Sequence, residues 1–175
     1  MKPHALTVFL LMLSVSCFCQ QRVNDGKLDL RKWNPAEEPV ISLDGRWEFY
    51  WNKLILSKDI TDQVTKSYAQ LSVPWNEQLI DDQSLPQDGA ATYRLTILLP
   101  SIDTVAFAVP AVFNSYAFWV NDSLVCSSGK VSTDVAAMIP AWRPQTVSVP
   151  ATDTLHVIFQ IANFQHTRGG CAELM

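Results

Sequence analysis

The sequence predicts an all-β domain built as an antiparallel β-sandwich. Three observations support this: short segments with apolar side chains at alternate positions, turn-forming residues between these segments, and very little helical patterning. Of the 175 residues, 48% are hydrophobic, which suits one globular domain with its own core. Many short strands with so little helix favour a sandwich over a fold that alternates strands with helices.

Alternation is clearest in residues 46–51 (RWEFYW) and 91–100 (ATYRLTILLP). In the first segment Trp47, Phe49 and Trp51 share one face, which predicts a half-buried strand. The second segment alternates large apolar residues with threonine and arginine in the same way. Further strands are expected at 104–110, 115–122, 123–129, 145–150 and 154–163.

Turn chemistry separates these strands. Asn121 and Asp122 predict a hairpin between two of them, and prolines 100, 110 and 150 close three others. Helical spacing occurs at residues 57–70, where either a helix or a surface loop is compatible with the pattern.

The N-terminus has the three-part pattern of a secretory signal peptide over residues 1–19. Lys2 precedes an apolar stretch that is short for a membrane span, and cleavage is expected after Cys19. We therefore expect export to the periplasm or cell surface, a lead-in over residues 20–38, and one domain over residues 39–175.

Cleavage would leave two cysteines, Cys126 and Cys171. An oxidising compartment permits a disulfide between them, and two separate buried thiols are the other possibility. The remaining sequence has no CxxC spacing and no His/Cys cluster, so no structural metal is expected.

Charge and motifs argue against several function classes. The formal net charge is −4 without a basic run, which disfavours a nucleic-acid partner. The sequence has no GxSxG, HExxH or GxxxxGK[ST] motif, and no acid–base pair is recognisable from spacing. His156 lies within a predicted strand, opposite its apolar face, and is interpreted as structural. We expect a protein that is not an enzyme and needs no cofactor.

Aromatic residues are the more informative feature, because tryptophan faces are common platforms for sugar rings. The chain has six tryptophans. Trp47, Trp51 and Trp119 fall in strand patterns and are expected in the core. Trp75 and Trp142 fall in proline-marked loops and are candidates for exposure.

Residues 163–170 (NFQHTRGG) follow the last predicted strand and are interpreted as a connecting turn. Gly169 and Gly170 are expected to supply backbone conformations with positive φ. His166 and Arg168 have no nucleophile or carboxylate recognisably paired with them, so catalysis is the weaker interpretation of this turn.

Taken in order, six segments resemble one known family, the type-2 extracellular domain of bacterial seven-transmembrane receptors with diverse intracellular signalling modules. The resemblance runs from about Trp33 to Gly170, through ISLDGRWEFYWNKLI, VPWNEQ, GAATYRLTILLP, YAFWVNDSLVCSSGKVS, WRPQTVSV and VIFQIANFQHTRGG. It implies a galactose-binding-like jelly roll outside the cytoplasmic membrane, followed by seven transmembrane helices, that senses a carbohydrate or another small molecule. The family continues past the RGG turn with another strand, so the jelly roll is expected to lack its last strand or strands.

Two alternatives stay open. One is the sugar-binding N-terminal module of a glycoside hydrolase that resembles the β-galactosidase family, which carries a similar series of segments. The other is a free-standing secreted binding protein. The residues of the segments RWEFYWNKL and NFQHTRGG favour the receptor module.

Jelly-roll modules usually bind ligands through loops at one end or through an outward sheet face. For Arg94 an ion pair is equally compatible, Trp75 could instead cap the open end of the sandwich, and His166 could be only a turn residue. The candidate ligand-binding residues are Trp75, Asn76, Tyr93, Arg94, Trp142, Arg143, His166 and Arg168.

Overall fold

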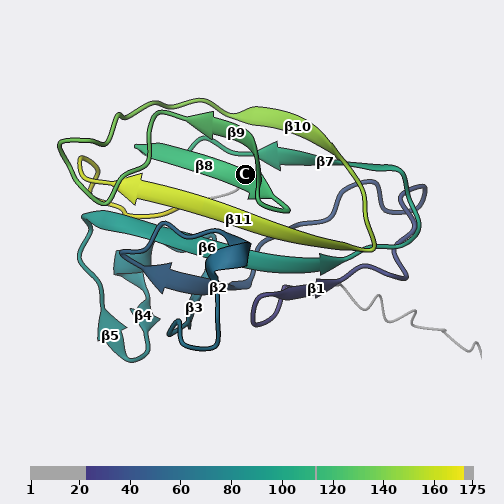
Figure 1. The fold of residues 1–175 in the computed structure, drawn as a ribbon, viewed down its shortest axis with the longest axis horizontal. Coiled ribbons are helices and arrows are strands. Elements are labelled where there is room, and N and C mark those ends of the chain that lie inside the picture. Colours follow the sequence, from purple (N-terminus) through teal and green to yellow (C-terminus); the bar gives the residue numbers. More distant parts are fainter. Residues whose placement is uncertain (1–22, 113, 172–175) are drawn as a thin grey trace, which may run out of the picture.

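The computed structural model describes residues 23–112 and 114–171, so the predicted signal peptide lies outside the described residues. A main sheet runs in the order β3, β2, β6, β11, β8, β9, with antiparallel neighbours (Figure 1). A short strand, β1 (Lys27–Asp29), pairs in parallel with the end of β6. The main-sheet strands are β2 (Arg46–Trp51), β3 (Ser67–Gln70), β6 (Gly89–Leu98), β8 (Ser115–Val120), β9 (Ser123–Ser128) and β11 (Thr154–Asn163).

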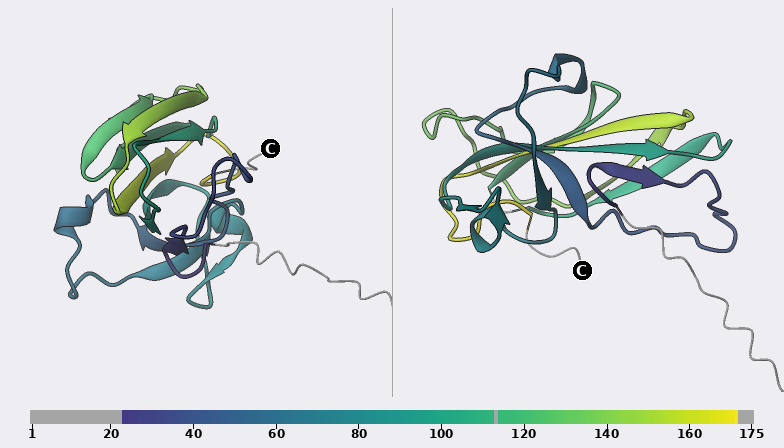
Figure 2. Two further views of the ribbon diagram at one scale, coloured as in Figure 1. Left: turned by 90° about the vertical axis from the view of Figure 1, so that its right-hand side faces the viewer. Right: turned by 90° about the horizontal axis from the view of Figure 1, so that it is seen from below.

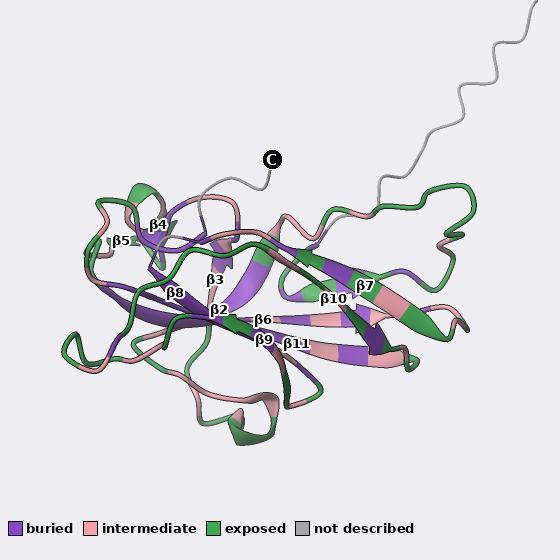
Figure 3. Cartoon of the chain, turned by 90° about the horizontal axis from the view of Figure 1, so that it is seen from above, coloured by how far each residue is buried: buried purple, intermediate pink, exposed green. Residues whose placement is uncertain are grey.

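A second layer covers the inner side of this sheet (Figure 2, left). Strands β7 (Thr104–Val109) and β10 (Gln145–Pro150) pair antiparallel, and Phe107 of β7 lies 5.3 Å from Phe118 of β8 between ring centroids. Buried and exposed residues alternate along both strands (Figure 3). The expected antiparallel β-sandwich is thereby confirmed. The remaining elements are the hairpin of β4 (Leu79–Ile80) and β5 (Gln83–Ser84), and the 3-10 turns η1 (Ser57–Asp59) and η2 (Trp75–Glu77).

The centre of the fold is the pairing of β6 with β11, which extends over ten residue pairs from Gly89 opposite Asn163 to Leu98 opposite Thr154. Their alternate residues point inward and are buried in the core. Phe159 of β11 meets Tyr116 and Phe118 of β8 in edge-to-face contacts. The inward set on these two strands is Ala91, Tyr93, Leu95, Ile97, Leu155, Val157, Phe159 and Ile161.

Turn positions agree with the sequence prediction. Asn121 and Asp122 connect β8 to β9 with φ values of 49° and 59°, as a two-residue hairpin turn of the primed type requires. Strands β2, β10 and β11 have the predicted bounds, and the three prolines lie at or just beyond strand ends.

Residues 57–70 do not form a helix. They contain the single turn η1, an irregular segment, and the edge strand β3, whose Ala69 is buried beside Trp47 of β2. The surface-loop alternative is therefore correct for the first part of this segment. Pairing with β2 overrides the weak helical spacing in its last four residues, because β2 would otherwise leave its backbone groups unpaired on that side.

A strap formed by residues 52–66 crosses the outer face of the main sheet, on the side opposite β1 (Figure 2, right). Backbone groups of Ile55 bond to Thr92 Oγ1 at 3.2 Å and to Gln160 Nε2 at 3.2 Å. The Asp122 carboxylate accepts from the backbone N–H of Ser57 at 2.7 Å. These bonds satisfy polar side chains that the strap buries on the outer face.

Because of this strap, β2 is buried on both faces and not half-buried as expected. Trp47 and Phe49 face the core, whereas Glu48 and Tyr50 are buried on the outer side. Trp119 also lies on the outer face, half-buried, where its Nε1 donates to Gln160 Oε1 at 3.1 Å. The prediction that Trp119 belongs to the sandwich core is therefore wrong.

Glu48 is the charged centre of this outer layer and is only 7% exposed. Its carboxylate accepts from Arg94 Nη1 at 2.8 Å, Tyr50 OH at 2.9 Å and Lys66 Nζ at 3.4 Å. Burial acts to raise the pKa of Glu48, but the hydrogen bonds from Arg94 and Tyr50 outweigh it, so the pKa is lowered.

Cys126 and Cys171 are both buried and are not joined by a disulfide. The disulfide alternative is wrong, and the buried-thiol alternative is confirmed. Burial raises the pKa of Cys171 to about 12, which keeps the thiol protonated and unreactive at neutral pH.

We predict that Glu48→Ala lowers the free energy of unfolding by about 2–3 kcal/mol, because it leaves the Arg94 guanidinium and the Tyr50 hydroxyl without their acceptor. Urea unfolding followed by circular dichroism measures this. Asp29→Ala is the matched control, because it removes an ion pair with Arg31 at 2.6 Å that is exposed, and the midpoint should not move. Equal losses in the two variants would contradict the structural role of Glu48.

We also predict a pH-dependent stability from His156, whose pKa is lowered by burial and by the positive charge of Arg94. As pH drops, His156 is therefore protonated in the unfolded chain at a higher pH than in the folded protein. The free energy of unfolding falls as pH drops through about 6.5 and stops falling below the folded-state pKa. Glu48 acts in a separate window: its contribution is present above about pH 4.3 and is lost below that value. Thermal melts between about pH 8 and pH 5 should show this slope, and His156→Gln should flatten it. An unchanged slope in the variant would refute the assignment.

Candidate functional site

The loop after β11 is folded around one buried amide, the side chain of Asn163. Its Nδ2 donates to the carbonyl oxygens of Gln87 at 2.9 Å and of His166 at 2.8 Å. Its Oδ1 accepts from the backbone N–H of His166 at 3.0 Å and from Nδ2 of Asn114. Asn163 is fully buried, so these bonds are the main determinant of the loop's shape.

Trp75 fixes the other end of the same loop. It is fully buried, its Nε1 donates to the Pro86 carbonyl at 2.9 Å, and its backbone N–H donates to the Gly169 carbonyl at 2.8 Å. A Cβ on Gly169 would overlap the Trp75 indole, and Gly170 has φ +100°. The expected positive φ is confirmed for Gly170, whereas Gly169 is required by the close approach of a ring.

Asn76 and Arg168 anchor this loop from its solvent side. Asn76 Nδ2 donates to the Thr167 carbonyl at 3.0 Å, and its Oδ1 accepts from the Gly169 N–H at 2.9 Å. Arg168 Nε lies 2.9 Å from Glu77 Oε1. Both residues were predicted as ligand contacts, and in the structure they hold residues 163–170 against η2.

Three other candidates lie away from any accessible site. Trp75 and Tyr93 are fully buried, so the prediction that they contact ligand is wrong, and Trp75 packs in the core against Trp51 with ring centroids 5.3 Å apart. Tyr93 is one of the alternate residues of β6 that point into the core, and its ring centroid lies 5.0 Å from that of Phe49. Arg94 forms the ion pair with Glu48, which was its structural alternative.

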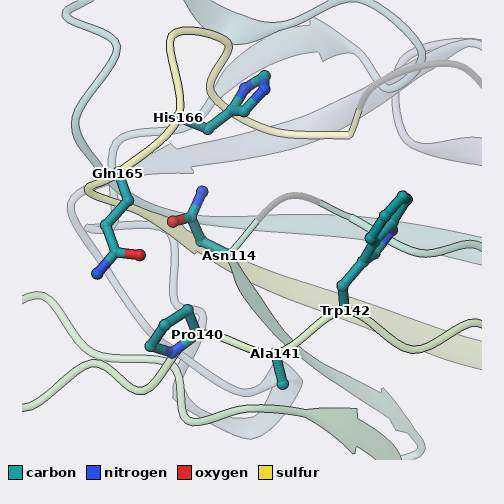
Figure 4. Close-up of a pocket in the computed structure, with 6 residues that line it drawn as sticks. All are labelled: Asn114, Pro140, Ala141, Trp142, Gln165 and His166. Carbon is teal, nitrogen blue, oxygen red and sulfur yellow. The ribbon is translucent and has the colours of Figure 1, made fainter.

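The remaining candidates surround a pocket of about 310 Å³ at the end of the sandwich (Figure 4). Three loops meet there: the residue before β8, the approach to β10, and the turn after β11. Trp142 is 74% exposed, which confirms its predicted exposure. Arg143 does not line the pocket, and its carbonyl accepts from Tyr116 OH at 2.8 Å. The lining residues are Asn114, Pro140, Ala141, Trp142, Gln165 and His166.

The pocket combines an aromatic face with amide and imidazole groups. In Figure 4, Trp142 and Gln165 lie on opposite sides, with Asn114 between them. The Ala141 N–H donates to the Asn114 carbonyl at 2.6 Å, which ties two of the three loops together. The Arg168 N–H donates to His166 Nδ1 at 3.1 Å, and the same ring nitrogen lies 3.3 Å from the Arg168 carbonyl oxygen, so the imidazole is held against the backbone of its own turn.

Sequence reasoning missed Asn114 and Gln165. Gln165 lies in the NFQHTRGG segment beside His166, so attention to the whole turn would have included it. Asn114 gave a weaker signal: it has φ +82°, a conformation that asparagine tolerates better than most residues, just before a strand. Only the fold brings it next to the turn, 49 positions away in sequence from Asn163.

Two further observations concern the described residues. These contain no group of three or more His, Cys, Asp or Glu side chains placed to hold a metal ion. Within residues 23–112 and 114–171, no helix has the length and apolar character needed to cross a membrane.

No family model matches this chain, and no curated protein matches it in sequence. The fold is similar to part of a β-glucuronidase from Faecalibacterium prausnitzii, with TM-score 0.50, 15% identity, and coverage of 69% of this chain and 20% of that one. A GH2 β-galacturonidase from Eisenbergiella tayi bound to galacturonate matches with TM-score 0.46, 13% identity, and coverage of 74% and 23%. This chain therefore spans about a fifth of the length of these enzymes. At 15% identity, the likeness to the β-glucuronidase supports the sandwich fold alone.

We predict that Gly169→Ala unfolds the pocket loop and lowers the free energy of unfolding by about 3 kcal/mol, since the new methyl group cannot share space with the Trp75 ring. Chemical denaturation and the near-ultraviolet circular dichroism of the buried tryptophans measure this. Thr167→Ala is the control, because the Thr167 side chain is exposed. The bond that Thr167 accepts from Asn76 uses its backbone carbonyl, which alanine retains. A stable Gly169→Ala protein with an unchanged tryptophan spectrum would contradict the predicted overlap.

Proposed function

We propose that this domain is a non-catalytic binding module that takes a saccharide or another small polar molecule in the Trp142–His166 pocket. The observation that carries the proposal is the position of Trp142, an exposed indole that faces a pocket containing two amides and an imidazole. A large apolar face held in water beside convergent polar groups is typical of small-ligand sites.

The pocket's construction supports binding in a pre-formed site. Its turn is held by Asn163, Trp75 and Asn76, and its second loop by the Ala141 bond to Asn114. Bonds that order the loops before a ligand arrives reduce the entropy cost of binding. The lining contains no carboxylate, hydroxyl or thiol side chain, so it supplies no nucleophile for a covalent step.

For the cellular role, we propose an extracytoplasmic sensor module of a bacterial seven-transmembrane signalling receptor. Its support is the resemblance to the type-2 extracellular domain, whose motifs have defined places here: RWEFYW is β2, and NFQHTRGG supplies one wall of the pocket. Export and a membrane-bound remainder of the protein belong to this proposal. A ligand would signal only by binding two receptor states unequally.

The second candidate is a sugar-binding module of a glycoside hydrolase, and the fold similarity to part of a β-glucuronidase favours it. The reading frame beyond codon 175 distinguishes these roles. Seven apolar spans would support the receptor, a barrel domain with catalytic glutamates would support the hydrolase, and a stop codon would support a free-standing binding protein.

We predict that Trp142→Ala weakens binding of the best ligand from a glycan array by about tenfold or more, since a central aromatic contact commonly contributes over 1 kcal/mol. Isothermal titration calorimetry on the folded domain measures the change. Val40→Ala is the matched control, because Val40 is 78% exposed and does not line the pocket. If a broad panel gives no binding to the folded domain, or if both variants bind equally well, the pocket is not a saccharide site.

A further inference from the structure

We infer that the pocket selects uncharged sugars and discriminates against uronates, whose rings carry a carboxylate. This inference rests on the proposed function and concerns the chemical class of the ligand at the same site. It comes from the charges and the fixed hydrogen-bonding directions of the lining residues.

The first argument is charge. Of the six lining residues, His166 is the only ionisable one, and no lysine, arginine, aspartate or glutamate lines the pocket. Two of the adjoining loops each carry an arginine. Arg168 is paired with Glu77 at 2.9 Å, and Arg143 does not line the pocket. A carboxylate that loses water needs a cationic partner with good geometry, and none of the six lining residues is a lysine or an arginine.

The second argument is the orientation of Asn114. One N–H of its Nδ2 donates to Asn163, and Asn114 is only 9% exposed, so the amide is held in one orientation with Oδ1 as an acceptor and the second N–H as a donor. An acceptor in a fixed position requires a donor on the ligand. A sugar hydroxyl can both donate to Oδ1 and accept from Nδ2, whereas a carboxylate can only accept and would leave Oδ1 without a donor.

The third argument is the mixture of apolar and polar groups in the lining, together with the volume of the pocket. Trp142, Pro140 and Ala141 provide apolar surface for a sugar ring face, and Gln165 offers both donors and an acceptor to its hydroxyls. The volume of about 310 Å³ lies at the lower limit of ligand pockets, which usually measure about 300–1,000 Å³. A small neutral glycoside therefore matches the lining better than a charged or long oligosaccharide does.

The test compares methyl glucoside and methyl galactoside with the matching methyl glucuronide and galacturonide, by calorimetry at about pH 8, where an ordinary histidine is neutral. We expect at least one neutral glycoside to bind about tenfold or more tightly than its uronate, with little dependence on salt. Equal or tighter binding of the uronate would overturn this inference and leave the proposed saccharide function intact. Absence of binding by both classes to the folded domain would remove the proposed function and this inference with it.

A charge variant provides an independent readout. Gln165→Lys places a cation at the pocket, so it should improve uronate binding relative to the neutral glycoside by about tenfold or more. Ser101→Lys adds the same charge at an exposed position between β6 and β7, outside the lining, and should leave the ratio unchanged. A Gln165→Lys protein with the original ratio would show that lining charge does not set the selectivity, and would overturn the inference.

Discussion

The ten-residue antiparallel pairing of β6 with β11 is the constraint on which the rest of the molecule depends. Its inward residues form the middle of the core, against which β8, β7 and the buried Trp75 pack. Its outward residues Thr92 and Gln160 bind the strap that closes the opposite face. Because a strand shifted by one residue would exchange these two faces, the register sets both layers together.

The candidate site is a consequence of how β11 ends. Asn163 is the last residue of that strand, and its buried amide turns the chain so that Gln165 and His166 reach the pocket while Gly169 meets Trp75. The site is therefore fastened to the core at two points. The glycine pair, which the sequence predicts as part of a connecting turn, serves ring packing and a positive φ, and the polar residues of the turn mostly hold the turn itself.

The fold and the pocket support different conclusions about this protein. A sandwich similar to part of a much longer β-glucuronidase establishes architecture, since one fold can serve many unrelated functions. The case for ligand binding comes from the pocket: an exposed indole, amides with defined orientation, and no charged partner for an anion. This case for binding does not depend on whether the domain belongs to a receptor or to a hydrolase.

The sequence by itself predicted the seven longer strands, β2 and β6 to β11, and the hairpin at Asn121, because period-two burial and turn chemistry are local properties. It did not predict the short strands β1, β3, β4 and β5 or the outward face of Trp119. It also indicated Trp142 and His166, and left the ligand role of the other candidates undecided. Only the tertiary structure decided that Trp75 and Tyr93 are buried, that Arg94 pairs with Glu48, and that Asn114 joins the pocket. Those outcomes depend on which loop covers which face, and contacts between residues far apart in the chain are not encoded in any local pattern.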